Sequence, residues 1–219
     1  MNWLKEKQIS VRSVEEILSG EVGIALTFDD GYVDNLTHAL PILKMYNFPA
    51  TVFVVAGKLG ETLEHDEPNE ASRLMQADEL VRLSDAGIEI GAHTLTHPRL
   101  AKLKHEEQRR EIVESVDKLA GILGKKIKGF AYPYGSILDY DVWSKECVAE
   151  SGCTYAVSNR FGPVQANSDP WAARRIWIDA SDSLTNFQCK VLGKLDGLWV
   201  LDSKPAMFSR RILNSILGT

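Results

Sequence analysis

Short apolar runs alternate with longer amphipathic stretches along most of the chain. Runs rich in β-branched and aromatic residues predict strands, at 23–28, 50–56, 87–92, 127–132, 154–157 and 174–179. The spacing of apolar positions predicts helices between them, at 34–45, 78–86, 106–123 and 139–151. A short helix is expected earlier, because Ser13-Val14-Glu15-Glu16 has the form of a capping box. This alternation predicts an α/β fold with a parallel sheet or barrel.

Two adjacent acids stand at the end of the first predicted strand. Asp29 and Asp30 follow Phe28 directly, and Gly31 then permits a sharp turn. The carboxyl end of a buried strand is where α/β folds present catalytic groups, and neighbouring carboxylates are costly to bury without a positive partner. An Asp-Gly turn with a helix cap explains the same residues. This stretch by itself does not decide between a functional and a structural role.

Two histidines stand at the end of another predicted strand. His93 and His97 follow the run 87–92 and are four residues apart. In a helical turn this spacing places both imidazoles on one side, where both reach a single metal ion. With one carboxylate they make a ligand set that leaves positions open for water and substrate. His38 is predicted to be a surface or packing residue, because nothing repeats its spacing, and His65 is predicted to belong to a solvated insertion.

Three stretches occur in the order of the motifs of a known family: Thr27-Phe28-Asp29-Asp30-Gly31, His93-Thr94-Leu95-Thr96-His97 and Phe130-Ala131-Tyr132-Pro133-Tyr134-Gly135. In these motifs the chain resembles the NodB-homology polysaccharide deacetylases, carbohydrate esterase family 4. The resemblance extends from about Val22 to Arg175. It implies a single-domain distorted (β/α) barrel over residues 1–219, with a motif-bearing core at about 22–202. It also implies metal-dependent removal of an acetyl group from an amino sugar.

The two acids are expected to have different roles. A divalent metal would be held by Asp30, His93 and His97. This nitrogen and carboxylate set suits Zn²⁺, and Fe, Co, Ni or Mn are also compatible with it. By resemblance to the family, Asp29 would be the general base that takes a proton as water attacks. A carboxylate bound to the metal is a poor base, because its charge is partly neutralised.

Further residues are expected to line the substrate site. In the family, the backbone N–H at the position matching Tyr134 helps to stabilise the tetrahedral oxyanion. Pro133 would stiffen this wall, and Trp177 would offer an aromatic face to a sugar ring. An ordinary aromatic-proline turn explains Tyr134 and Pro133 equally well.

Two features depart from the family's pattern. Ala131 stands where the third motif often carries an arginine that steadies the catalytic acid. Arg175, with Arg174 as second choice, is expected to supply that charge from a neighbouring strand. Many members use a late histidine to protonate the departing amine, but no histidine follows His105 here. Asp202 occupies the corresponding place, so that Asp202, a water or no group at all serves as the acid; loss of a general acid costs about 10²–10⁴-fold in rate.

Composition and charge narrow the range of partners. A net charge of -5 and a pI of about 5.6 argue against a nucleic-acid-binding protein. No apolar run is long enough to span a membrane and residues 1–7 are not a secretory signal, so a cytoplasmic or inner-membrane-associated location is expected. The basic amphipathic stretch 208–217 predicts a helix that packs on the domain or makes peripheral contact with a membrane. The three cysteines contain no Cys-x-x-Cys pair and are expected to be buried thiols.

The sequence therefore predicts a hydrolase that removes N-acetyl groups from N-acetylhexosamine units of a polysaccharide or a lipid-linked glycan precursor. An amidase or cyclic-imide hydrolase acting on a small molecule with the same metal site is one alternative. A non-catalytic carbohydrate-binding relic of the fold is another, although retention of Asp29 argues against it because a binder needs no base. The sequence does not determine the sugar, the native metal or the oligomeric state.

Overall fold

A parallel sheet organises the chain. The computed structural model describes residues 1–64, 66–67, 69 and 72–197, so that His65, Asp202 and the stretch 208–217 lie outside the described residues. Six strands are hydrogen-bonded side by side in sequence order: β3 (Thr27–Phe28), β4 (Thr51–Val54), β5 (Glu89–Ala92), β6 (Gly129–Ala131), β7 (Tyr155–Phe161) and β8 (Ala173–Arg175). Every pairing in this sheet is parallel, which requires a crossover between successive strands.

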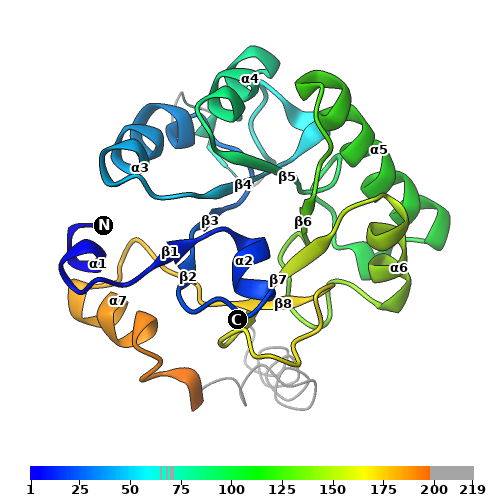
Figure 1. The fold of residues 1–219 in the computed structure, drawn as a ribbon. Coiled ribbons are helices and arrows are strands. Elements are labelled where there is room, and N and C mark those ends of the chain that lie inside the picture. The colour runs from blue at the N-terminus through cyan, green and yellow to red at the C-terminus, as the bar shows by residue number, and fades with distance from the viewer. Residues whose placement is uncertain (65, 68, 70–71, 198–219) are drawn as a thin grey trace.

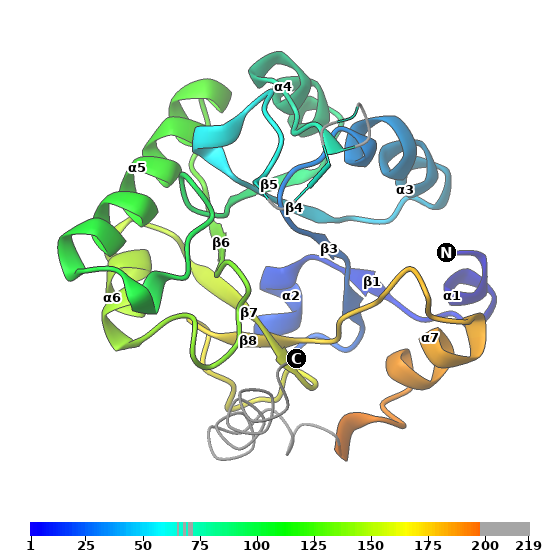
Figure 2. The ribbon, with the colours of Figure 1, turned by 180° about the vertical axis from the view of Figure 1, so that it is seen from behind.

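The sheet curls into a partial barrel. Figures 1 and 2 show the strands arranged around a common centre, with β3 and β8 as the two edges. The edges approach each other across an open seam, where Nη1 of Arg175 donates to Oγ1 of Thr27 at 3.1 Å. The predicted distorted (β/α) barrel is therefore confirmed.

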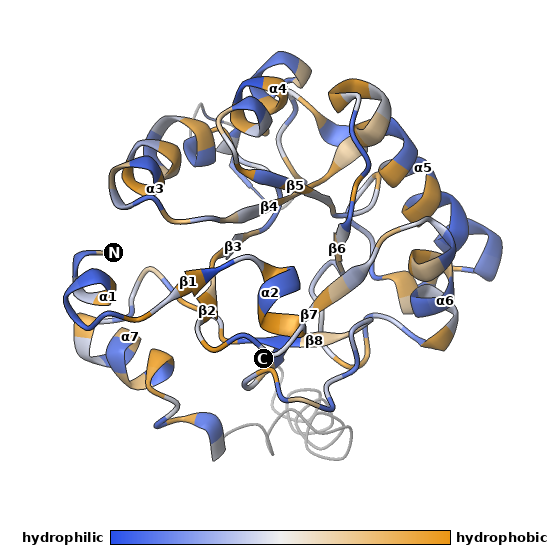
Figure 3. Ribbon diagram, viewed as in Figure 1, coloured by the Kyte–Doolittle hydropathy of each residue, from blue (hydrophilic) through white to orange (hydrophobic). Residues whose placement is uncertain are grey.

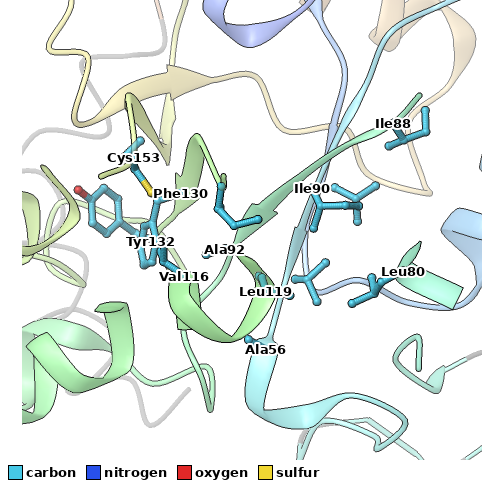
Figure 4. Packing of buried hydrophobic residues seen from close by; sticks show 14 of the residues in the cluster. Ala56, Leu80, Ile88, Ile90, Ala92, Val116, Leu119, Phe130, Tyr132 and Cys153 are labelled. Atoms are coloured by element: carbon cyan, nitrogen blue, oxygen red, sulfur yellow. The ribbon is translucent and has the colours of Figure 1, made fainter. Parts of the chain in front are cut away.

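Helices cover the outer side of the sheet. They are η1, a π-helix (Asn35–Ala39), α3 (Leu40–Tyr46), α4 (Ala77–Asp85), α5 (His105–Leu123) and α6 (Val142–Glu150), with short 3-10 turns η2 (Ala56–Lys58) and η4 (Leu100–Lys102). Hydrophobic and hydrophilic residues alternate along these helices (Figure 3), as expected when one face is buried. Figure 4 shows this packing, in which Ile90 and Ala92 of β5 meet Leu80 of α4 and Leu119 of α5.

The N-terminal segment packs inside and beside the barrel. Helix α2 (Val14–Leu18) contributes Val14 to a cluster with Phe53 and Tyr155 of the strands. The predicted capping box is present, since the N–H of Glu16 donates to Oγ of Ser13 at 3.2 Å and the N–H of Ser13 donates to the Glu16 carboxylate at 2.8 Å. The remaining elements are α1 (Asn2–Glu6), the paired strands β1 (Val11–Arg12) and β2 (Ile24–Ala25), and α7 (Leu184–Val191).

The first and the last predicted strands differ most from the observed ones. The run 23–28 is not one buried strand, because β2 pairs with β1 whereas β3 pairs with β4. Both halves are half-buried, since β3 is an edge of the main sheet and β2 belongs to a separate two-stranded sheet. The run 174–179 is a strand only as far as Arg175.

Pro41 explains how the helix predicted at 34–45 begins. The N–H of Leu40 donates to the carbonyl of Asn35, five residues earlier, so the first turns form a π-helix. Proline has no N–H to continue the α-helical ladder. The regular helix α3 therefore starts only at Leu40.

Candidate active site

The three predicted metal ligands meet at the carboxyl ends of β3 and β5. Oδ1 of Asp30 lies 3.6 Å from Nε2 of His93 and 3.3 Å from Nε2 of His97. One ligand atom from each of the three residues lies within 4.8 Å of the other two. A tetrahedral ion with bonds of about 2.1 Å sets its ligand atoms about 3.4 Å apart. The spacing of these atoms therefore suits a single small cation.

The hydrogen bonding of His93 also fits a metal ligand. His93 is 1% exposed, and its Nδ1 lies 2.7 Å from the carbonyl oxygen of Ala131. Because a carbonyl oxygen only accepts, Nδ1 carries a proton, and Nε2 is the ring nitrogen that faces Oδ1 of Asp30. The approach of Nε2 to that carboxylate is favourable when a cation, either a proton or a metal ion, lies between them. An imidazole oriented by a backbone carbonyl is also the usual outer-shell arrangement of a metal-binding histidine.

The histidine loop does not form the helical turn that the four-residue spacing predicted. Residues 93–97 are not helical, and Thr94 (φ 66°) and His97 (φ 64°) have left-handed backbone conformations. The N–H of His97 donates to Oγ1 of Thr94 at 3.0 Å, and the two imidazole centroids are 5.0 Å apart. A non-glycine residue in a sparsely populated conformation costs about 1–3 kcal/mol and persists where surrounding contacts fix it. Left-handed residues, rather than helical periodicity, therefore bring the imidazoles together.

A buried carboxylate on α5 provides such contacts. Glu111 is 4% exposed and accepts hydrogen bonds from the N–H groups of Leu95 and Thr96, both at 2.9 Å, and from Oγ1 of Thr96 at 2.8 Å. Glu111 was not predicted from the sequence, because charged positions on a helix are usually solvated. One signal was available: Glu111 directly precedes Ile112 of the apolar stripe, and helical periodicity therefore places it near the buried face.

Arg175 contacts Asp29, the acid that is not among the three candidate metal ligands. Its Nη1 donates to Oδ1 of Asp29 and its Nη2 to Oδ2, both at 2.7 Å, and the two side chains are 13% and 24% exposed. Burial by itself raises the pKa of Asp29, but the charge and hydrogen bonds of Arg175, together with the two histidines, lower it to about 2. The structure therefore places the Arg175 guanidinium directly against Asp29. The guanidinium reaches Asp29 from the opposite edge of the sheet rather than from a neighbouring strand, because the sheet curls.

A tight turn follows β6 beside the histidines. Tyr134 (φ 60°) and Gly135 (φ 64°) are left-handed, and the N–H of Gly135 donates to the carbonyl of Pro133 at 2.6 Å. The Tyr134 ring is 42% exposed, with its centroid 4.9 Å from that of His97. Within the described part of the chain, the backbone N–H of Tyr134 has no hydrogen-bond acceptor.

Asn159 links this turn to Arg175. Its Oδ1 accepts from Nη2 of Arg175 at 2.6 Å, and its Nδ2 donates to the carbonyl of Tyr134 at 3.3 Å. The Asn159 N–H also donates to the carbonyl of Gly135 at 2.9 Å. Asn159 was not predicted from the sequence, because a single asparagine in a strand forms no motif. Its contacts connect the acid Asp29, through Arg175, to the turn that carries Tyr134.

Comparison with known proteins assigns the family. The family model described as Polysaccharide deacetylase matches residues 19–155, which is more than half of the 219-residue chain. The chain belongs to the polysaccharide deacetylase family. It is also similar in structure to a Streptococcus pyogenes deacetylase, PplD, solved in complex with acetate, with a TM-score of 0.72 and 25% identity, covering 86% of this chain and 82% of that one.

Two curated relatives are named for their glycan substrates. The chain is 36% identical over 125 residues to a peptidoglycan-N-acetylglucosamine deacetylase of Bacillus cereus, covering 56% of this chain and 40% of that protein. It is 26% identical over 194 residues to a poly-beta-1,6-N-acetyl-D-glucosamine N-deacetylase of Staphylococcus aureus, covering 81% of this chain and 64% of that protein. The chain therefore spans less than two thirds of the length of either relative.

In this member of the polysaccharide deacetylase family, β6 contributes no charge at the position where an arginine is often found in the family. Ala131 is fully buried there. Side chains alternate between the two faces along a strand, so Arg174 and Arg175 of β8 point to opposite sides. Arg174 donates to the carbonyl of Phe161 at 2.9 Å, and Arg175 is the one that meets Asp29.

The remaining predicted residue of the site lies beyond β8. Trp177 is 67% exposed, and its carbonyl accepts a hydrogen bond from Nζ of Lys190 at 2.9 Å. Contact between its ring and a sugar stays a prediction. Among the described residues, no helix combines the length and hydropathy needed to cross a bilayer.

Proposed function

We propose that this protein is a metal-dependent N-deacetylase that hydrolyses the N-acetyl group of N-acetylhexosamine units in a polysaccharide or a lipid-linked glycan precursor. The main support is one arrangement of side chains. Asp30, His93 and His97 converge on one point, and Asp29, which directly precedes Asp30 in the sequence, has an ionised carboxylate. Family membership supports the reaction class, and the substrates in the names of the relatives support the class of glycan.

The metal we propose is Zn²⁺, because two imidazoles and one carboxylate match its ligand preference. Fe, Co, Ni and Mn also bind ligands of these types, with different affinities. A divalent cation at Asp30, His93 and His97 supplies a Lewis acid that polarises the acetyl carbonyl and lowers the pKa of water. The chain's own residues supply the positioning and the proton transfers.

Asp29 accepts a proton from the water that attacks the acetyl carbon. Its low pKa keeps it ionised at neutral pH but also makes it a weak base, so that its contribution depends on its fixed position beside the ligand set. The N–H of Tyr134 donates to the oxyanion that develops on the substrate, with Pro133 stiffening the turn. When the C–N bond breaks, the nitrogen takes up a proton from Asp202 or from water, and the products are acetate and the free amine.

Acetate release tests this proposal. Zinc-loaded protein and its Asp29→Asn variant are incubated with oligomers of β-1,6-linked N-acetylglucosamine, chitin oligomers and peptidoglycan fragments, and acetate and bound zinc are both measured. We expect acetate from at least one glycan with the unmodified protein. The variant should keep its zinc and lose at least about 100-fold in turnover.

Other outcomes identify the alternatives. Ammonia from a small amide, or ring opening of a cyclic imide, with no acetate from any glycan would identify the amidase or cyclic-imide hydrolase. Saturable glycan binding without release of any product would identify the non-catalytic carbohydrate-binding domain. Full turnover by the Asp29→Asn variant would exclude Asp29 as the base.

A further inference from the structure

We propose that Arg99, anchored by the buried carboxylate of Asp139, is a positioning residue that holds the Tyr134 turn in place beside the histidine loop. The effect of Arg99 on turnover rests on the function proposed above, whereas its effect on the rigidity of the turn does not. Arg99 and Asp139 lie outside the three sequence motifs, and the fold brings them to the same place.

Asp139 joins the two segments that flank the site. It is 1% exposed, and its carboxylate accepts hydrogen bonds from Nη1 of Arg99, from the N–H of Ser136 at 2.9 Å and from Oγ of Ser136. Its backbone carbonyl accepts from the N–H of Ala101 at 2.9 Å. A buried carboxylate requires partners of this kind. These partners come from the segment after the histidines and from the segment after the Tyr134 turn.

Arg99 extends this connection to the aromatic ring. The guanidinium carbon of Arg99 lies 3.8 Å from the centroid of the Tyr134 ring. A planar guanidinium can stack on an aromatic face while one of its N–H groups donates to a carboxylate, which a lysine ammonium cannot reproduce. The Tyr134 ring also lies 4.9 Å from the His97 ring, at 49° to it. The ring therefore contacts a fixed cation as well as a candidate metal ligand.

The Tyr134 backbone needs such support. Its φ of 60° is unusual for a residue with a side chain, and such conformations persist where several contacts determine them. Asn159 fixes the carbonyl of Tyr134, and Arg99 fixes its ring, while Asp139 binds the turn two residues later through Ser136. The backbone N–H remains for the oxyanion. A preorganised donor contributes most to catalysis when it does not have to reorient, so release of the ring should lower turnover.

The competing interpretation is an ordinary ion pair at the protein surface. Arg99 is 34% exposed, and exposed pairs contribute little. The two interpretations differ in what Arg99→Ala changes. A surface pair affects neither the rigidity of the turn nor turnover, whereas a positioning residue affects both while leaving the metal ligands intact.

The test combines amide hydrogen exchange with kinetics. Exchange at Gly135 and Ser136 is measured by NMR on the metal-free protein for Arg99→Ala, Arg99→Lys and the control Arg109→Ala. Arg109 makes an exposed pair with Glu150 at 4.0 Å and is therefore a matched arginine away from the site. Zinc affinity, kcat and KM for acetate release are then measured on the same variants.

We expect Arg99→Ala to speed exchange at Gly135 and Ser136 about tenfold or more, and to lower kcat about 10–100-fold, with KM and zinc affinity changed less than about threefold. Arg99→Lys should recover only part of the loss, and Arg109→Ala should match the unmodified protein. Unchanged exchange, unchanged kcat, or a fall in zinc affinity equal to the fall in kcat would overturn the proposal. If the unmodified protein releases no acetate, the proposed function fails, and the exchange measurement still decides whether Arg99 positions the turn.

Discussion

Arg175 and Asp29 form a two-bond ion pair that crosses the open seam of the barrel. Each of the two hydrogen bonds is 2.7 Å long, and the residues belong to opposite edges of the six-stranded sheet. The same guanidinium also donates to Thr27 on β3 and to Asn159 on β7. One side chain therefore holds the acid of the site and connects the first strand of the sheet with the last two.

Replacement of Arg175 should affect both turnover and stability. We expect Arg175→Ala to lower kcat about 100-fold, because Asp29 loses the contacts that orient it. The free energy of unfolding should fall by about 2–3 kcal/mol, because a largely buried carboxylate loses its charged partner. Arg175→Lys should recover only part of the activity, because an ammonium keeps the charge but cannot form the two parallel hydrogen bonds. Acetate release and urea denaturation measure these effects.

Arg174→Ala is the matched control for that experiment. Arg174 is adjacent in sequence and points to the other face of β8, where it donates to the carbonyl of Phe161. Its loss should change kcat by less than about threefold, because it does not orient the acid. If Arg174→Ala and Arg175→Ala lower turnover equally, the loss results from disturbance of strand β8 and not from loss of the ion pair with Asp29.

Removal of the metal should abolish acetate release, and Zn²⁺ should restore it. We expect His97→Ala to weaken zinc binding more than about 100-fold, beyond the loss typical of an outer-shell partner. Zinc at 100 times its dissociation constant should stabilise the unmodified protein by about 2.7 kcal/mol and should stabilise the variant by less than about 0.4 kcal/mol at that concentration. His38→Ala, at an exposed histidine of η1, should behave like the unmodified protein. Thermal unfolding with and without zinc provides the comparison, and equal stabilisation of both variants would contradict the ligand assignment.

Glu111 should control the metal site indirectly. Glu111→Gln keeps the shape of the side chain but loses the charge that accepts three hydrogen bonds from residues 95–96. We expect zinc affinity to fall about 10–100-fold, and the free energy of unfolding to fall by about 3 kcal/mol. Glu114→Gln, at an exposed position on the same helix, is the control. Zinc titration that gives the same affinity for both variants would show that the loop holds its conformation without Glu111.

Two glycines should respond to alanine in opposite directions. Gly135 has φ 64°, and a Cβ there would lie 2.5 Å from the backbone nitrogen of Asn159. We expect Gly135→Ala to lower the free energy of unfolding by more than about 1 kcal/mol. Gly121 lies within α5, where a Cβ meets no atom within 4 Å, and Gly121→Ala should raise stability by about 0.5–1 kcal/mol. Urea denaturation of both variants checks the sign, and a stabilising Gly135→Ala would mean that the turn relaxes without cost.

Asp202 stays a prediction, because it lies outside the described residues. If it protonates the departing amine, Asp202→Ala should lower kcat about 10²–10⁴-fold without changing zinc affinity. Kinetics on an activated ester substrate provide the control, because its leaving group needs no proton and the loss should shrink. An unchanged kcat on the N-acetylated glycan would assign that proton to water.

The elements of the fold and the residue types of the site could be predicted from sequence because both depend on local patterns. The strands were visible as short apolar runs, and α5 was visible as a stripe ending at Gly124. Asp30, His93 and His97 were recognisable because carboxylate and imidazole groups are metal ligands. The conformation predicted for the histidine loop was wrong, because the spacing favoured a helical turn and Thr94 and His97 are left-handed instead.

Local patterns along the chain specify the succession of strands and helices and the groups available for chemistry, because hydrophobic periodicity and side-chain type are properties of neighbouring residues. Which distant groups support them depends on the packing of the folded chain. Glu111 reaches the histidine loop from α5, Arg175 reaches Asp29 across the seam, and Asp139 joins Arg99 to the Tyr134 turn. These contacts depend on how far the sheet curls and on the face of the strand or helix from which each side chain projects. That curvature results from the packing of the whole barrel, and no short stretch of sequence encodes it.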